Sequence, residues 1–209
     1  ENLEALEKGL PNLLQHVDNV KNVYGLPCVV AINAFPTDTK AELDLVESKC
    51  RELGVNVRLS EVWAKGGEGG LALAEEVVRL CDEPNHFQFV YDVNDSIEDK
   101  LNAIATKVYH ADGVVIAASA KKQLKQLTEL GFDKLPICMA KTQFSFSDDA
   151  SKLGAPRGFK ITVRDLKVNA GAGFLVAKTG DIMTMPGLPK VPSAEKIDVD
   201  ENGRITGLF

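Results

Sequence analysis

The sequence predicts an α/β fold: a mostly parallel sheet with flanking helices, Rossmann-like, followed by a smaller, loop-rich antiparallel α+β subdomain. Short apolar runs such as residues 28–32 alternate five times with amphipathic helical patterns, as in parallel strands covered by helices. Beyond about residue 141 the helical patterns end and prolines become more frequent. We therefore expect an α/β domain at 1–125 and an antiparallel subdomain at 126–209.

In the first half, apolar spacing predicts a helix over the first twenty residues, strands at 28–32, 55–59 and 87–91, a helix from Thr39 to Leu53, a loop at 63–70 and a helix at 71–80. Pro11 should interrupt the first helix or begin a second one, because proline lacks the N–H that a helix interior needs. Thr39 and Glu42 have the spacing of a capping box, and Gly54 should end their helix.

In the second half, the predicted elements are a helix capped by Ser96, a strand at 114–117, a helix at 121–130 ended by Gly131, and strands at 137–140, 160–168 and 174–177. The apolar alternation slips between Val163 and Leu166, which predicts a β-bulge. Asn202-Gly203 between the apolar runs 196–199 and 204–208 predicts a β-hairpin.

Composition excludes several classes of partner. The chain has 24 basic and 30 acidic residues, a net charge of -6, which argues against nucleic acid as the main partner. No run of about 18 apolar residues exists, so no membrane span is expected. Four cysteines without a C-x-x-C pair predict reduced thiols, mostly in the core, of a cytoplasmic protein. The chain begins with Glu1 rather than Met, and we expect it to be a piece of a longer protein.

Ligands of open α/β sheets bind beyond the carboxyl ends of the strands, which directs attention to three loops: 33–38, 61–70 and the segment after residue 140. Phe35 precedes Pro36 and is therefore held extended, while Trp63, the single tryptophan, lies beside four glycines. Two aromatic side chains on neighbouring loops could sandwich a flat heteroaromatic ring. Two alternatives stay open: Phe35 caps the sheet core, or Trp63 is tucked into the core beside a flexible linker.

The segment Gly67-Glu68-Gly69-Gly70-Leu71-Ala72 also matches G-x-G-x-x-A, with Asp92 about 20 residues further on at a predicted strand end. A stand-alone dinucleotide-binding domain is therefore an alternative, although Glu68 would repel a pyrophosphate. A non-catalytic oligomerisation module is another. No G-x-x-x-x-G-K-[ST] phosphate loop occurs in the 209 residues.

Several long segments together resemble formate–tetrahydrofolate ligase, also called formyltetrahydrofolate synthetase. They are VVAINAFPTDT (29–39), VWAKGGEGG (62–70), PICMAKTQFSFSDD (136–149), IMTMPGLP (182–189) and the closing NGRITGLF (202–209). The similarity covers essentially the whole chain and resembles the C-terminal portion of that enzyme, without the N-terminal domain that carries the ATP phosphate loop.

The resemblance implies an ATP-dependent ligase of one-carbon metabolism that joins formate to tetrahydrofolate through formyl phosphate, with Mg²⁺ accompanying ATP. It implies that Phe35 and Trp63 flank the pterin ring and that Lys65, Glu68 and Gly69 lie near the same cleft. It assigns no catalytic residue and no metal ligand in this chain. The implied partners are formate, ATP and tetrahydrofolate, the implied assembly is a homotetramer, and the fragment alone should be inactive.

Overall fold

The computed structural model describes residues 1–180, 182 and 190–207, and it confirms the mixed α/β class. The α-helices are α1 (Leu3–Asp18), α2 (Lys40–Glu52), α3 (Val62–Lys65), α4 (Leu71–Cys81), α5 (Ile97–Ala103) and α6 (Ala118–Glu129). Single π-helical turns, η1 (Asn19–Val23) and η3 (Ile104–Val108), extend α1 and α5, and 3₁₀ turns form η2 (Gly66–Gly70) and η4 (Ser193–Glu195).

The strands described form three sheets rather than one. They are β1 (Val29–Asn33), β2 (Asn56–Ser60), β3 (Val114–Ile116), β4 (Ile137–Ala140), β5 (Ile161–Asn169), β6 (Phe174–Thr179), β7 (Asp198–Val199) and β8 (Ile205–Thr206). β1 and β2 form a parallel pair, β3-β5-β6-β4 form a mixed sheet, and β7 pairs with β8. In the mixed sheet the β3–β5 and β4–β6 pairs are parallel and the β5–β6 pair is antiparallel.

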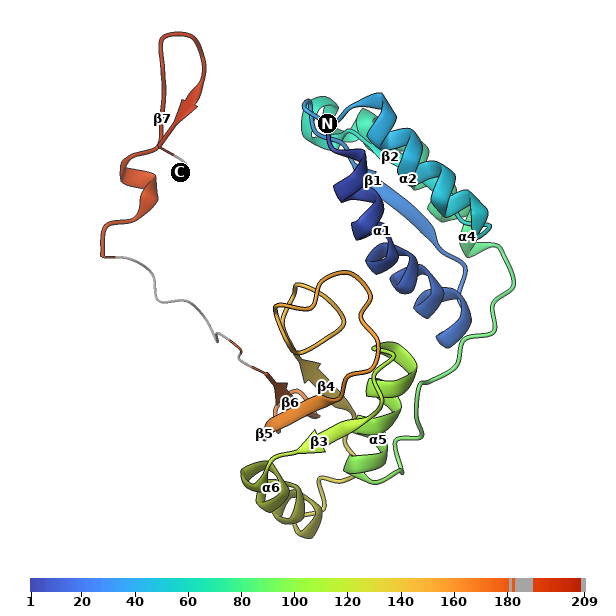
Figure 1. The fold of residues 1–209 in the computed structure, drawn as a ribbon, viewed down its shortest axis with the longest axis vertical. Helices are drawn as coiled ribbons and strands as arrows, with labels where there is room; N and C mark the ends of the chain where they lie inside the picture. Colours follow the sequence, from blue (N-terminus) through green and yellow to red (C-terminus); the bar gives the residue numbers. More distant parts are fainter. Residues whose placement is uncertain (181, 183–189, 208–209) are drawn as a thin grey trace.

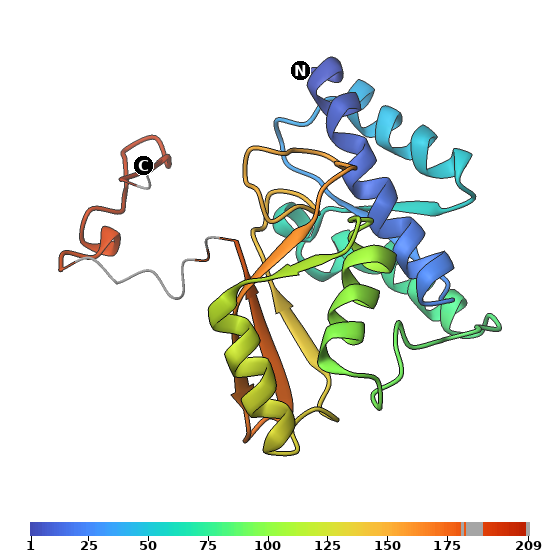
Figure 2. The same cartoon turned by 60° about the horizontal axis from the view of Figure 1, so that its bottom comes forward.

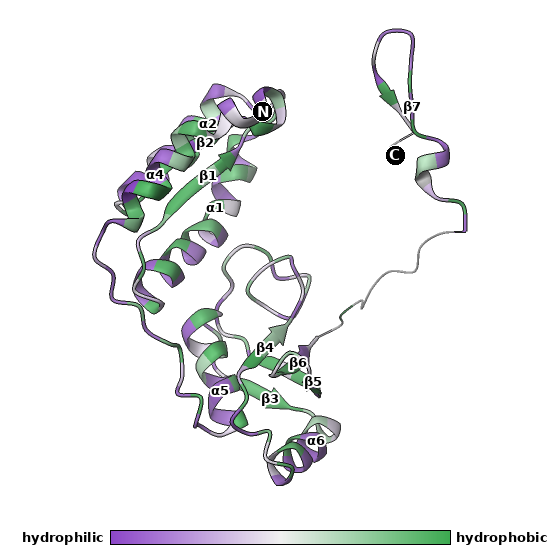
Figure 3. Cartoon of the chain, turned by 180° about the vertical axis from the view of Figure 1, so that it is seen from behind, coloured by the Kyte–Doolittle hydropathy of each residue, from purple (hydrophilic) through white to green (hydrophobic). Residues whose placement is uncertain are grey.

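The first lobe, residues 1–81, packs helices on the β1–β2 pair (Figure 1). Its core contains Val17 of α1, Val30 of β1, Cys50 of α2 and Val57 of β2, all nearly inaccessible to water. The predicted capping box is confirmed, because the Thr39 side chain accepts from the backbone N–H of Glu42 and the Glu42 carboxylate accepts in return. Figure 3 shows β1 as an apolar strand between more polar helices, with Val30 buried on one face and Ala31 exposed on the other.

The second lobe, residues 97–180, is built on the mixed sheet with α5 and α6 against it (Figure 2). Leu101, Val163 and Leu175 are completely buried in its core. The predicted bulge is confirmed: the β5–β6 register shifts between Val163 and Asp165. The predicted boundary between residues 125 and 126 falls inside α6, and strands from both sides share this sheet. The division of the chain into domains at 1–125 and 126–209 stays a prediction.

Helix α1 joins the two lobes through polar side chains on one face. Asn12 donates to the carbonyl of Gly154, and the Asn19 side chain, in the turn that follows, donates to the carbonyl of Val108. Arg157 donates to the Gln15 side chain at 2.6 Å. These contacts reach across about 90 to 140 residues of sequence, so α1 fixes how the lobes are placed.

The prediction that Pro11 interrupts the first helix is wrong, because α1 runs through it. Pro11 cannot donate to the carbonyl of Glu7, one turn earlier. Both residues are exposed, so water can hydrate that carbonyl and the helix continues.

The strand predicted at 87–91 is wrong as well. This stretch belongs to the connecting segment, residues 82–96, which is extended but pairs with no strand in the described part of the chain. Its backbone is tied instead to the end of η1: Gln88 N–H donates to Tyr24 O and His86 N–H to Gly25 O. A strand needs a neighbouring ladder as well as β-forming residues, and none lies alongside.

The loop predicted at 63–70 is helical instead, as α3 followed by η2. The backbone N–H groups of Ala64 and Lys65 both donate to the carbonyl of Glu61, and the Lys65 ammonium pairs with the Glu61 carboxylate at 2.7 Å. Gly66, at φ 61°, then separates α3 from η2 because it can adopt a left-handed conformation.

The prediction that the cysteine thiols lie mostly in the core holds for only some of the four cysteines. All four cysteines are free, as predicted; Cys50 is fully buried and Cys28 half-buried, but Cys81 and Cys138 are exposed. Cys138 follows Ile137 in β4, where successive side chains point to opposite faces of the sheet. The apolar run alone did not reveal that one of those faces is open.

Near the C-terminus, β7 and β8 confirm the predicted antiparallel hairpin around Asn202-Gly203. The backbone N–H groups of Asn202 and Arg204 donate to the Asp200 carboxylate, and Gly203 has φ 77°. Figures 1 and 2 show this hairpin standing apart from both lobes. Most of the motif at 182–189, and residues 208–209, lie outside the described residues.

Glu76 of α4 ties that helix to β2. Its side chain is only 3% exposed, yet Arg79, Asn56 and Arg58 all donate to its carboxylate, at 2.7, 2.7 and 2.9 Å. Arg79 first, then Asn56, lower the pKa of Glu76 from 4.5 to about 2. The stability that ionised Glu76 supplies is therefore fully present above pH 4.5 and is lost as the pH falls toward about 2.

We expect Glu76→Gln to lower the free energy of unfolding near neutral pH and to do so less at about pH 3. Urea denaturation of both proteins at the two pH values measures this difference. Glu75→Gln, at the exposed neighbouring position, is the matched control and should behave like the unmodified chain. A Glu76→Gln effect that is the same at both pH values would contradict the assignment.

Candidate functional site

The parallel pairing of β1 and β2 brings two loops to one edge of the sheet. Asn33 lies opposite Ser60 at the carboxyl ends of the strands, and the backbone N–H of Ala34 donates to the carbonyl of Ser60 at 3.0 Å. The chain leaves both strands at this edge, where open α/β sheets bind their ligands.

Phe35 begins the turn that follows β1. Its backbone N–H donates to the Asp38 carboxylate at 2.8 Å, and the Asp38 N–H donates back to the Phe35 carbonyl at 3.0 Å. This reciprocal pair fixes the backbone on which the ring is mounted. The Phe35 side chain is 51% exposed, so the alternative in which it caps the sheet core is wrong.

Trp63 lies in α3, the short helix that follows β2 at the same edge of the sheet. It is 67% exposed, which contradicts the alternative that tucks it into the core. A large aromatic side chain this exposed loses apolar burial that the fold could otherwise use, so its position is better suited to a ligand than to packing.

The remaining predicted site residues follow Trp63 in α3 and η2. Lys65 is engaged with Glu61, as described above, and Glu68 is exposed. Gly69 packs against the backbone: a Cβ there would lie 2.4 Å from the carbonyl oxygen of Glu61, and the Glu61 N–H donates to the Gly69 carbonyl at 3.0 Å. Only glycine fits, so Gly69 closes the turn that carries Trp63.

Thus one sheet edge collects all five predicted residues, with Phe35 after β1 and the other four after β2. The dinucleotide alternative loses its geometric basis. It required Asp92 at the end of a strand, and the connecting segment forms no strand there. It also required an open glycine loop, whereas Gly66–Gly70 form a 3₁₀ turn held against Glu61.

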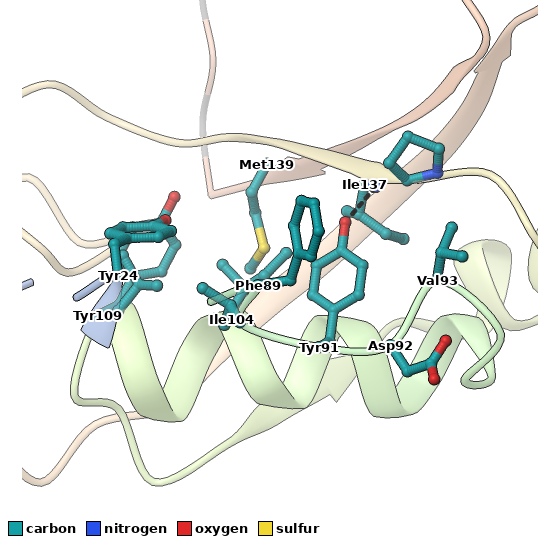
Figure 4. Close-up of a pocket in the computed structure, with 12 residues that line it drawn as sticks. Tyr24, Phe89, Tyr91, Asp92, Val93, Ile104, Tyr109, Ile137 and Met139 are labelled. Carbon is teal, nitrogen blue, oxygen red and sulfur yellow. Dashed lines mark hydrogen bonds between the residues drawn. The ribbon is translucent and has the colours of Figure 1, made fainter. Parts of the chain in front are cut away.

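Sequence reasoning missed an apolar cavity of about 760 Å³ in and beside the second lobe (Figure 4). Its lining comes from the residue after η1, the connecting segment, η3 and the residue after it, and β4 and the residue before it: Tyr24, Phe89, Val90, Tyr91, Asp92, Val93, Ile104, Val108, Tyr109, Pro136, Ile137 and Met139. The alternating aromatic residues 87, 89 and 91 were the available signal, but they were interpreted as a strand.

No helix among the described residues has the length and apolar character needed to cross a bilayer. Within the same residues, no group of three or more His, Cys, Asp or Glu side chains gathers as a potential metal-ligand set.

The fold and this edge define the class: an α/β protein that presents two exposed aromatic side chains at the carboxyl ends of adjacent parallel strands. Comparison with known families identifies the family to which the chain belongs. The family model described as formate–tetrahydrofolate ligase matches residues 1–209, and the chain belongs to that family. The family joins formate to tetrahydrofolate with ATP.

Lys100 of α5 holds two backbone segments that border the cavity. The residue is completely buried, and its ammonium donates to the carbonyls of Val93, Asp133 and Leu135 at 3.1, 2.5 and 2.8 Å. Burial lowers the pKa of Lys100. The three bonds tie the connecting segment to the turn before β4.

We expect Lys100→Met to lower the free energy of unfolding by on the order of 3 kcal/mol, because it leaves three carbonyls without their donor. Urea denaturation measures the loss. Lys134→Met is the control: Lys134 donates to one carbonyl, that of Asn94, and its side chain is 56% exposed. Equal losses in the two variants would show that the buried ammonium does not hold the rim.

Proposed function

We propose that this chain is the C-terminal portion of a formate–tetrahydrofolate ligase and supplies its tetrahydrofolate-side site, with Phe35 and Trp63 flanking the pterin ring. The observation that carries the proposal is the placement of two exposed aromatic side chains on neighbouring strand ends, each on a backbone fixed by local hydrogen bonds. Family membership supplies the reaction and the substrate class.

Both rings are suited to the task by their geometry. A flat pterin held between two aromatic faces can slide but not tilt, so stacking sets the direction of its reactive amine. Each aromatic contact contributes on the order of 1 kcal/mol beyond burial of area. Holding the amine close to an activated formyl group replaces a bimolecular encounter, and a closed apolar sandwich excludes water from a hydrolytically labile intermediate.

Lys65, Glu68 and Gly69 are proposed to border the same cleft. Gly69 acts through the backbone, because it lets η2 close against Glu61 and so sets where α3 presents Trp63. Lys65 supports the same turn through its ion pair with Glu61. Neither residue is assigned a chemical step.

The phosphoryl chemistry requires groups that this sequence does not carry. Transfer from ATP needs clustered cationic donors and Mg²⁺ around the phosphates, and the 209 residues contain no phosphate-loop motif. We infer that the ATP phosphates are bound by another part of the enzyme. The homotetrameric assembly and cytoplasmic location implied by the resemblance stay predictions.

The purified 209-residue chain should therefore give no ATP-dependent formation of formyl-tetrahydrofolate. Following the product in the presence of formate, ATP, Mg²⁺ and tetrahydrofolate checks this directly. An enzyme that carries the missing phosphate site is the positive control. Turnover by the isolated chain above the rate without protein would refute the division of labour.

In an enzyme that contains this chain, Phe35→Ala and Trp63→Ala should each raise the KM for tetrahydrofolate about tenfold, the equivalent of 1.4 kcal/mol. The KM for ATP should change little, because neither side chain is proposed to contact the nucleotide. Phe144→Ala is the matched control, since Phe144 is 56% exposed on the loop after β4. An unchanged tetrahydrofolate KM in both variants rules out the sandwich.

A further inference from the structure

The apolar cavity of the second lobe lies under a segment that has no strand partner but is pinned in place. Lys107 of η3 donates to the carbonyl of Val90 at 2.8 Å, and buried Lys100 donates to that of Val93. The Tyr91 hydroxyl accepts from the backbone N–H of Ile137 at 2.9 Å, which ties the segment to β4 (Figure 4). The side chains of Lys100, Lys107 and Tyr91 thus fix the segment to the second lobe.

The held segment leaves an apolar pocket that is partly open to solvent. Its apolar walls stay in contact with water, which a bound apolar ligand would displace. At about 760 Å³ the cavity falls in the range of roughly 300–1,000 Å³ that small-molecule sites occupy. A space of this size, with a rim fixed by hydrogen bonds, is preorganised for a ligand.

The lining determines the chemistry of that ligand. Tyr24 and Tyr109 form one end, and Ile104 and Met139 form the middle, where a polarizable thioether suits an aromatic ring (Figure 4). Burial raises the pKa of Tyr109 to about 12, so its hydroxyl stays neutral. The aromatic end and apolar middle favour a flat ring system over a flexible chain.

Charge excludes an anion. Among the described residues that line the cavity, Asp92 is the charged one, and Figure 4 shows it at the end opposite Tyr24 and Tyr109. An anionic group would be desolvated beside apolar walls and would meet the Asp92 carboxylate at one end, while the ammonium groups of Lys100 and Lys107 already donate to backbone carbonyls of the segment.

We propose that the cavity between the connecting segment, η3 and β4 is a second ligand site, which binds a neutral, flat aromatic molecule. The site is separate from the sheet edge that carries Phe35 and Trp63, and it does not depend on the proposed folate role. Phe89, which lines the pocket, is 81% exposed, so the pocket is open to solvent at that residue.

Two fluorescent probes that share one ring system test this proposal. N-phenyl-1-naphthylamine is neutral, and 1-anilinonaphthalene-8-sulfonate carries a sulfonate on the same scaffold. We expect saturable binding of the neutral probe to the 209-residue chain, about tenfold tighter than that of the sulfonate. With ¹³C-methyl-labelled methionine, the Met139 resonance should shift on binding, because Met139 lines the cavity.

Variants locate the probe. Ile104→Phe fills the middle of the cavity and should abolish binding, and Phe89→Ala, at a position whose side chain is mostly exposed, should weaken it several-fold without touching the core. Phe144→Ala is a control that should leave binding unchanged, since Phe144 is exposed and does not line the cavity. Binding that is absent, that is equal in Ile104→Phe, or that favours the sulfonate overturns the proposal. So does binding that emerges only on dilution, which would mean that a second copy covers the cavity.

Discussion

The parallel pairing of β1 with β2 is the constraint on which the candidate site depends. Parallel strands deliver their carboxyl ends to one edge, and the register from Val29 opposite Asn56 to Asn33 opposite Ser60 leaves that edge level. The turn after β1 then carries Phe35 and the turn after β2 carries Trp63. A shift of one residue in either strand would reverse which side chains face the core, so the buried pattern of Val30 and its neighbours also fixes the site.

The two lobes are held together by contacts of a different kind. The lobe cores are apolar and separate, whereas α1 reaches the second lobe through side-chain amides and the Arg157 guanidinium. The ring of His16 also lies 4.4 Å, centroid to centroid, from that of Phe146. Polar bonds are directional, so this interface fixes one arrangement of the lobes. The connecting segment supplies the covalent link and, through its pinned backbone, the roof of the apolar cavity.

Features decided by neighbours in sequence were predictable. The capping box of Thr39 and Glu42, the bulge after Val163 and the turn at Gly203 each follow from residues within a few positions of one another. The exposed aromatic pair was predictable as well, because strand order along the chain places the loops that follow parallel strands at one edge.

Features decided at a distance were not predictable. Residues 87–91 have β-forming side chains, but whether a partner strand lies beside them depends on the packing of the whole lobe, and here none does. The helical turns of α3 and η2 depend on the close backbone contact between Glu61 and Gly69. A glycine-rich sequence does not by itself indicate that contact. The cavity depends on three side chains that hold the connecting segment, and no local pattern encodes that.

The central claim is that the two aromatic side chains at the β1–β2 edge form one stacking site for a pterin. Trp63 is the single tryptophan, so its fluorescence reports on that edge alone. Titration of the 209-residue chain with tetrahydrofolate should quench this emission saturably, and Phe35→Ala should weaken the apparent affinity about tenfold, since it removes the opposite face of the sandwich. Quenching that does not saturate, or that is unchanged in Phe35→Ala, would contradict the account.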